Sequence, residues 1–334
     1  MAKYTRNSGK QWTGQEVRRL KTLASQNTPM RVIGLELGRP VAGVSGLFDQ
    51  IKYPATPGLS TGVKPFIKWA GGKSQLLPIL RKMLPSSFKR YFEPFLGGGA
   101  LFFDLGPSSA ILSDTNEELI NCYQVVKTSP QSLISALSKF KSNEKDFYKI
   151  RALDPTQLSK KERATRFLYL NKTCFNGLYR VNKRGRFNTP FGHFKNVNLV
   201  DEENLFGASD LLQFAEVRCM DYHQLLMVKA THGDFVYLDP PYLPISKYSD
   251  FKRYTKNFFY EEDHVRLASL FKILNRRGCK ILLSNSYHPR VVNLYEGFNM
   301  RVVEAARFIN CKGDKRGTVK ELLVSNFDAA LQIP

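Results

Sequence analysis

Asp239-Pro240-Pro241-Tyr242 brings together the groups that a reaction at a planar amine requires. It directly follows the apolar run 235–238, which has the composition of a buried strand. Proline fixes φ and removes the backbone N–H, so the segment is stiff and presents carbonyl oxygens, notably that of Pro240. The Asp239 carboxylate and this carbonyl can accept both hydrogens of an exocyclic amine, while Tyr242 offers a flat face to a ring. The alternative is an ordinary turn with a surface tyrosine, and the position after a strand favours chemistry.

A glycine-rich turn follows another apolar segment, in FEPFLGGGA (92–100). Glycine lets the backbone approach a nucleoside-bearing ligand closely, although the pattern alone is weak evidence. A further apolar run, 110–113, ends in Asp114, where an acid can accept hydrogen bonds from ribose hydroxyls. Asp114 can also cap a helix that begins at Asn116 or Glu117, and the two roles are compatible.

The segment FIKWAGGK (66–73) continues into Ser74, so its end resembles a phosphate-binding loop. That loop requires glycine at position 67, where the chain has Ile67. We therefore reject ATP binding and interpret Lys73 as a cation for a carboxylate of a different cofactor.

Short apolar strands alternate with helical stretches over most of the chain. We predict strands at 88–94, 110–113, 235–238 and 280–284, and helices such as 117–126 and 261–274. This pattern predicts an α/β fold with a parallel sheet covered by helices. In such sheets ligands bind at the carboxyl ends of the strands. Asp239-Pro240-Pro241-Tyr242, the glycine-rich turn and Asp114 all stand at such ends.

The first residues predict a small three-helix module, 1–53, followed by a linker rich in Pro, Gly, Ser and Thr, 54–63. Trp12-Thr13-x-x-Glu16 is typical of a capping box, and Thr28-Pro29 begins a second helix that Gly38 ends. A third helix is expected from Pro40 to Ile51. The module resembles a Myb/SANT-like or helix-turn-helix unit, and nine basic against three acidic residues in 1–60 suit contact with a DNA backbone. The alternative is an appendage that only packs on the main domain.

The charge of the chain indicates a polyanionic partner. Its 334 residues include 50 Lys and Arg against 29 Asp and Glu, a net charge of +21. Such an excess favours nucleic acid, and no amphipathic basic helix points to a lipid surface instead. The N-terminus lacks a secretory signal and no apolar run is long enough to cross a bilayer, so we expect a cytoplasmic protein without a membrane partner. The five cysteines form no C-x-x-C pair, and we expect no metal.

Taken in order, five motifs resemble the Dam/DpnII-type family of adenine-N6 DNA methyltransferases in its α-type arrangement. FIKWAGGK is similar to the family's cofactor segment, FEPFLGGGALF to its glycine-rich motif, ILSDTN to its acidic strand and DPPY to its catalytic motif. YLNKTCFNGLYRVNKRGRFNTPFG (169–192) resembles its DNA-recognition hairpin. The resemblance covers residues 64–334 and leaves the N-terminal module out.

The resemblance implies a Rossmann-like core that uses S-adenosylmethionine, formed by 64–116 and 206–334, with a target-recognition domain inserted at 117–205. It implies methyl transfer to an adenine flipped out of double-stranded DNA, with GATC as the first recognition sequence to consider. Whether the enzyme pairs with a restriction enzyme, acts alone or comes from a phage stays open; we expect a monomer associated with the nucleoid. The catalytic residues would be Asp239, Pro240 and Tyr242. The cofactor-binding residues would be Trp69, Lys73, Phe95, Gly97, Asp114 and Asp239.

A basic segment carries the expected DNA contacts. Residues 171–190 hold five basic side chains and no acid, with aromatic residues between them, and 182–185 is typical of a hairpin turn. The resemblance makes Arg180 a base-contacting residue and Leu178 or Phe175 a wedge beside the flipped base; the alternative is a solvated basic turn. The predicted DNA-binding residues are Lys172, Phe175, Asn176, Leu178, Arg180, Lys183, Arg184 and Arg186.

Two other functions remain to be weighed. An acid-Pro-Pro-aromatic loop also serves methyltransferases that act on RNA or protein, and the predicted DNA hairpin argues against them. A DNA-binding regulator could keep the fold without the catalysis, but the intact Asp239 and Tyr242 argue against that.

Overall fold

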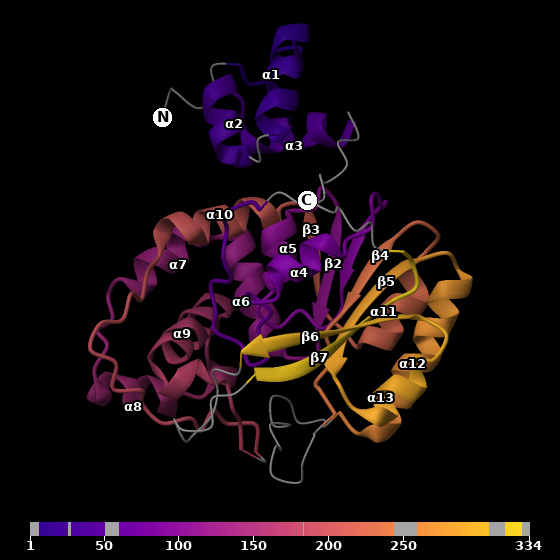
Figure 1. The fold of residues 1–334 in the computed structure, drawn as a ribbon. Helices are drawn as coiled ribbons and strands as arrows, with labels where there is room; N and C mark the ends of the chain where they lie inside the picture. The colour runs from indigo at the N-terminus through magenta and orange to yellow at the C-terminus, as the bar shows by residue number, and fades with distance from the viewer. Residues whose placement is uncertain are drawn as a thin grey trace.

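The computed structural model describes residues 7–25, 28–50, 60–182, 184–243, 259–306 and 318–328. Within these residues a seven-stranded sheet forms the centre of the larger part of the molecule (Figure 1). The strands are β1 (Tyr91–Glu93), β2 (Ala110–Asp114), β3 (Ala215–Cys219), β4 (Phe235–Leu238), β5 (Lys280–Ser286), β6 (Asn299–Ala306) and β7 (Thr318–Ser325).

The strand order is β3-β2-β1-β4-β5-β7-β6. The first five strands are parallel, and β7 lies antiparallel between β5 and β6. The chain order reverses between β1 and β4, so the crevice in which α/β sheets bind ligands is expected at the carboxyl ends of these two strands. The predicted parallel sheet with covering helices is confirmed for these five strands, whereas the antiparallel strand β7 was not predicted.

Helices cover both faces of the sheet because successive strand residues point to opposite sides. Tyr91 and Phe235 pack into the core of one face, and their neighbours Phe92 and Val236 pack into the core of the other. The first face carries α4 (Leu77–Lys82), α5 (Ala100–Leu105), α6 (Glu117–Thr128) and α10 (Glu202–Leu212), and the second α11 (Tyr222–Lys229), α12 (Glu261–Arg276) and α13 (Pro289–Leu294).

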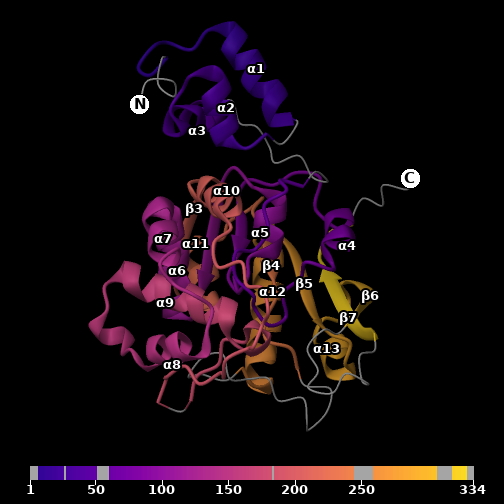
Figure 2. The same ribbon diagram turned by 90° about the vertical axis from the view of Figure 1, so that its left-hand side faces the viewer.

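A helical insertion lies between α6 and α10. Its elements are α7 (Pro130–Leu137), α8 (Glu144–Ala152), α9 (Lys160–Thr173) and the 3-10 turns at Pro155–Gln157 and Phe175–Gly177. α9 packs on α6, and Figure 2 shows α7, α8 and α9 together on one flank of the sheet. α6 itself packs on β2 and β3, so it joins the insertion to the sheet.

The N-terminal helices form where the sequence predicts them. They are α1 (Gly14–Ser25), α2 (Met30–Leu37) and α3 (Val41–Gln50). The Thr13 backbone N–H donates to the Glu16 carboxylate (2.9 Å) and the Glu16 N–H donates to the Thr13 hydroxyl (3.2 Å), which completes the capping box. Gly38 ends α2 in the left-handed region with φ of 63°. The small core contains Leu20, Leu23, Ile33, Leu37 and Val44.

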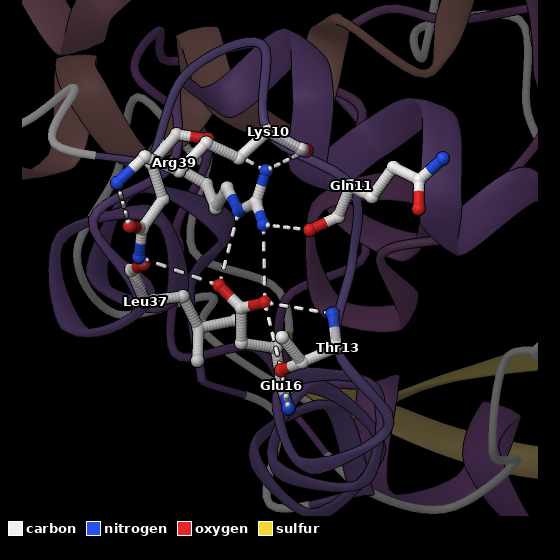
Figure 3. A network of polar contacts seen from close by, with 7 residues as sticks. Lys10, Gln11, Thr13, Glu16, Leu37 and Arg39 are labelled. Carbon is white, nitrogen blue, oxygen red and sulfur yellow. Dashed lines mark hydrogen bonds and ion pairs between the residues drawn. The ribbon is translucent and has the colours of Figure 1, made fainter.

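Arg39, in the tight turn between α2 and α3, is buried and holds the module together (Figure 3). Its guanidinium donates to both Glu16 carboxylate oxygens (3.1 and 3.0 Å) and to the carbonyls of Asn7 (2.6 Å) and Gln11 (2.8 Å). It also lies 4.5 Å from the centre of the Trp12 ring. The hydrogen bonds from Arg39 lower the pKa of Glu16 to about 2. This arginine therefore serves the module's structure, since the ion pair and the carbonyls occupy its donors.

The module packs at the amino ends of the strands. Arg31 of α2 lies over the Phe206 ring of α10, 4.7 Å from its centre. Pro29 and Met30 line the same small cavity as Gly106 and Ser108, which precede β2. Figure 1 shows the module at the end of the sheet away from the hairpin that follows α9.

Candidate active site

Three adjacent strands bring the candidate segments to one edge of the sheet. β1 leads into the glycine-rich turn, β2 ends at Asp114, and β4 leads directly into Asp239. Because β2, β1 and β4 are neighbours and parallel, their carboxyl ends meet, and residues about 20 to 150 positions apart in the chain come together.

The glycine-rich turn is fixed by Asp114 and covered by Trp69. The Gly97 N–H donates to one Asp114 oxygen (3.1 Å), and the Asn116 N–H donates to the other (2.9 Å). Gly97 has φ of 46°, and a Cβ there would lie 2.6 Å from Cδ1 of Trp69, so this position requires glycine. Asn116, rather than Asp114, caps α6 by accepting the Leu119 N–H (3.0 Å); the predicted capping role of Asp114 is wrong. Burial raises the pKa of Asp114 against these hydrogen bonds.

Lys73, Asp239 and Tyr242 form a contiguous cluster. The Lys73 ammonium pairs with the Asp239 carboxylate at 2.9 Å and donates to the Gly71 carbonyl at 2.6 Å. It also lies 4.6 Å from the centre of the Tyr242 ring, a cation–π distance. The Asp239 side chain keeps 17% exposure, whereas Pro240 is buried. The aspartate therefore remains reachable although a cation partners it.

Two more carboxyl groups flank Asp239. Glu93 of β1 is buried and accepts a hydrogen bond from the Tyr91 hydroxyl (2.8 Å). Glu321 of β7 accepts a hydrogen bond from the Tyr242 hydroxyl (2.6 Å). Burial raises the pKa of Asp239 to about 6; Lys73 opposes the rise and the charge of Glu321 adds to it. Burial also raises the pKa of Glu93 to about 8, which keeps this group protonated at neutral pH.

Phe95 lies in an aromatic cluster that packs on the second face of the sheet, whereas Trp69 packs on the first. Its ring stacks on Tyr222, with centroids 4.9 Å apart, and meets the edge of Phe259 at 5.9 Å. Tyr222 follows Asp221, the residue that caps α11 after β3. The Tyr222 hydroxyl is buried and has no hydrogen-bond partner among the residues that the structure describes. The cluster thus offers flat apolar faces and one unsatisfied polar group.

The segment after α9 folds back on itself as the sequence predicts. Bridges join Cys174 to Phe191 and Val181 to Phe187, and the Asn182 N–H donates to the Arg186 carbonyl (2.9 Å). Phe175, Asn176, Arg180, Arg184 and Arg186 are exposed, and Leu178 is half-buried. Lys183 lies outside the described residues.

Among the described residues, the predicted DNA-binding side chains of Lys172 and Arg180 have hydrogen-bond partners in the chain. Lys172 is half-buried and donates to the Asn198 carbonyl (3.3 Å), and burial lowers its pKa. Arg180 donates from Nε to the Asn188 side chain (2.9 Å). This bond steadies the guanidinium of Arg180 and engages only one of its three nitrogens.

The base of this hairpin contacts the cofactor segment predicted from the sequence. Tyr179 stacks on Trp69, with centroids 5.7 Å apart and planes inclined by 22°. Asn171 of α9 exchanges two hydrogen bonds with the Lys68 backbone, 2.8 and 2.7 Å long. A change in the hairpin's position would therefore reach Trp69 and the glycine-rich turn beneath it.

Three groups of the site were not predicted from the sequence. Glu93 lies in the motif FEPFLGGGA (92–100), and only its burial distinguishes it from an ordinary glutamate. Asp221-Tyr222 follows a strand, and this position could have revealed it. Glu321 carried no local signal, because its partner Tyr242 is 79 residues away.

Two classes of site have no support among the described residues. No group of His, Cys, Asp or Glu side chains there is arranged to hold a metal ion. In the same part of the chain, no helix combines the length and apolar character needed to span a membrane.

The chain is similar to proteins of one enzymatic class. Residues 69–309, more than half of the chain, match the model of the D12 class N6 adenine-specific DNA methyltransferases. The chain is 42% identical to the Type II methyltransferase M1.LlaDCHI of Lactococcus lactis subsp. cremoris, over 79% of this chain and 96% of the relative. It is 43% identical to the Type II methyltransferase M.MjaIII of Methanocaldococcus jannaschii, over 79% and 99%. It is 34% identical to the DNA adenine methylase of Escherichia coli K12, over 78% and 94%.

Proposed function

The chain belongs to the D12 class N6 adenine-specific DNA methyltransferase family, and we propose that Asp239, Pro240 and Tyr242 hold the reacting adenine. The amine nitrogen is a poor nucleophile, because its lone pair is delocalised into the ring. The Asp239 carboxylate and the Pro240 carbonyl would accept its two hydrogens and draw the nitrogen toward tetrahedral geometry. The Tyr242 ring would stack on the extruded base, contributing about 1–3 kcal/mol toward a flipping cost of a few kcal/mol.

The single observation that carries this assignment is the meeting of Asp239, Tyr242 and the glycine-rich turn at one sheet edge. Asp239 acts as an orienting acceptor and need not remove a proton before attack. Once the new N–C bond has formed, the nitrogen is positively charged, and its proton then leaves readily. Because a carboxylate accepts better than a carboxylic acid, kcat/KM should rise as the pH passes the Asp239 pKa of about 6.

We infer that the methyl donor is S-adenosylmethionine, which supplies an electrophilic methyl group on a sulfonium. The residues present suit its parts. Phe95 and Tyr222 offer stacking faces for a purine, and the unsatisfied Tyr222 hydroxyl offers a polar contact. Asp114 accepts one backbone N–H on each oxygen and keeps lone pairs for ribose hydroxyls. Trp69 lies against Gly97, and both would line the adjoining part of the cofactor site.

Lys73 would bind the donor's carboxylate. In the structure its ammonium pairs with Asp239 instead, so the proposed role requires the lysine to leave the aspartate. A cationic sulfonium near Asp239 would replace the charge that Lys73 takes away.

We propose that the substrate is double-stranded DNA and that the segment 171–192 binds it. This segment would belong to a domain, 117–205, that is inserted between the two core segments 64–116 and 206–334. The exposed arginines of this segment support it, with Phe175 or Leu178 as the wedge beside the flipped base. GATC is the proposed recognition sequence. Two relatives carry Type II names, and this supports a place in a restriction-modification system. We propose a monomer that works in the cytoplasm at the nucleoid.

One experiment tests activity, acceptor base and recognition sequence together. Genomic DNA from cells that express the protein is sequenced by a method that reports N6-methyladenine, with Asp239→Ala and Glu296→Ala expressed in parallel. We expect one methylated motif for the wild type and for Glu296→Ala, which removes an exposed carboxylate. Asp239→Ala should give none while its thermal unfolding midpoint is unchanged. Near-normal methylation by folded Asp239→Ala would refute the catalytic assignment, and a motif other than GATC would refute the proposed specificity.

A further inference from the structure

A pair of residues on the neighbouring strands β5 and β7 forms hydrogen bonds with the segment that follows Asp239. Ser286 of β5 and Glu321 of β7 are register partners. The Tyr242 hydroxyl donates to Glu321 (2.6 Å), and the Ser286 hydroxyl donates to the Leu243 carbonyl (2.9 Å). The consecutive residues Tyr242 and Leu243 are therefore held by the two side chains of this residue pair.

We propose that Glu321 is a positioning residue for methyl transfer, acting through the Tyr242 hydroxyl to fix the ring on which the target base would stack. The proposal rests on the assignment of Asp239 and Tyr242 to the reaction. A hydrogen bond from a phenol to a carboxylate is short and stronger than one between neutral groups. The contacts continue from Glu321 through Tyr242 to Lys73, whose ammonium reaches Asp239 at 2.9 Å.

The antiparallel strand β7 makes this contact geometrically natural. β7 lies beside β5 and carries Glu321 to the carboxyl end of β5, where the segment after β4 also arrives. Glu321 is half-buried, and one oxygen of its carboxylate accepts the hydrogen bond from Tyr242. The sheet around it is otherwise rich in apolar residues. A group placed only for solubility would point to water, as Glu304 of β6 does.

Glu321 also acts on Asp239 by its charge. Among the residues that the structure describes, the ionisable groups that interact electrostatically with Asp239 are Lys73 before α4, Glu93 and Tyr91 of β1, Tyr237 of β4, Tyr242, and Glu321 of β7. Of these, Lys73 lowers the pKa of Asp239 and Glu321 raises it. Removing the charge of Glu321 therefore moves the protonation of Asp239 to lower pH.

Glutamine and alanine separate the two effects. Glu321→Gln keeps an oxygen that can accept from the Tyr242 hydroxyl and removes the charge, whereas Glu321→Ala removes both. On single-turnover methylation of duplex DNA at plateau pH, we expect Glu321→Ala to lose about tenfold or more and Glu321→Gln about threefold. Both variants should move the acid limb of the kcat/KM profile to lower pH. Glu304→Ala, the exposed glutamate of the neighbouring strand, is the matched control and should behave as wild type.

A double-mutant cycle with Tyr242→Phe tests whether the hydroxyl carries the effect. We expect Tyr242→Phe to lose about as much as Glu321→Ala, and the double variant no more than either single one. Multiplying losses, or a Glu321→Ala rate within twofold of wild type, would overturn the proposal. So would an equal loss of rate and of thermal unfolding midpoint that Glu321→Gln fails to rescue, because that is the signature of a structural role.

The outcome is distinguishable from failure of the proposed function. If Asp239→Ala is inactive and Glu321→Ala is normal, only the positioning role falls. If folded Asp239→Ala remains active, the assignment of the catalytic segment falls first.

Discussion

At the scale of residues, two carboxyl groups that share one neighbourhood differ in how readily they ionise. Asp239 lies beside the Lys73 ammonium, and its pKa rises only to about 6. Glu93 is more deeply buried and receives one hydrogen bond from Tyr91, which does not offset its desolvation, so its pKa rises to about 8. At neutral pH Glu93 therefore adds no negative charge beside Asp239, and the aspartate can ionise.

The raised pKa of Glu93 predicts a cost in stability. In the unfolded chain a glutamate ionises near 4.5, whereas the folded chain keeps Glu93 protonated up to about pH 8. Between these values the folded state binds more protons, so its stability falls as the pH rises, by at most about 1.4 kcal/mol per pH unit for this group. Glu93→Gln, which is neutral at every pH, should be more stable than wild type by a margin that grows from pH 5 to pH 8.

Urea unfolding at several pH values measures this margin. Glu304→Gln is the control, because it makes the same chemical change at an exposed glutamate of β6. A constant difference between Glu93→Gln and wild type would show that Glu93 is ionised in the folded protein.

At the scale of elements, the hairpin after α9 is held at its base and exposed along its length. Asn171 fixes the base to the Lys68 backbone, and Tyr179 stacks on Trp69. Arg180, Arg184 and Arg186 stand exposed beyond it. A hairpin that is anchored where it leaves α9 and exposes cations further along lets one arginine contact the edge of a nucleobase at a fixed depth.

Arg180 and Arg184 are predicted to differ in what they contact. Arg180→Ala should cost roughly 1–3 kcal/mol of discrimination at one base pair, because its oriented guanidinium can pair with guanine. Arg184→Ala, in the turn, should weaken binding to all sequences alike. Competition binding to duplexes with single base-pair changes measures both; an equal loss on every duplex for Arg180→Ala would make it a backbone contact.

At the scale of the whole molecule, the excess of cations predicts binding that depends strongly on salt. The net charge is +21, yet Arg39 is buried and Arg19 pairs with Glu36. The module that holds them lies at the amino ends of the strands, away from the candidate active site. Its predicted contact with DNA would therefore involve a stretch of duplex other than the one at the catalytic residues, and the helix-turn-helix assignment stays a prediction.

The salt dependence can be measured directly. If the protein neutralises about six phosphates, its affinity should fall about a thousandfold between 50 and 200 mM salt. A titration of labelled duplex at four salt concentrations gives the slope of log Kd against log salt. A slope near zero would mean that the net charge serves solubility and not DNA binding.

The sequence by itself determined the family, the α/β class and the segments of the site. Each rests on a local pattern: Asp239-Pro240-Pro241-Tyr242 follows an apolar strand, Asp114 ends another, and the glycine-rich turn follows a third. The predicted strands at 110–113 and 235–238 match β2 and β4 within one residue, while β1 is shorter than the predicted 88–94. The family match and the DNA adenine methylase relative then confirmed the prediction of an adenine-N6 DNA methyltransferase.

Only the tertiary structure decided which groups meet. Sheet order placed β7 between β5 and β6 and so brought Glu321 to Tyr242. Burial distinguished Glu93 from an ordinary glutamate, and packing made Arg39 a structural residue. The physical reason is that hydrophobic periodicity and turn chemistry act over a few neighbouring residues, whereas desolvation and ion pairing depend on partners far away in the chain.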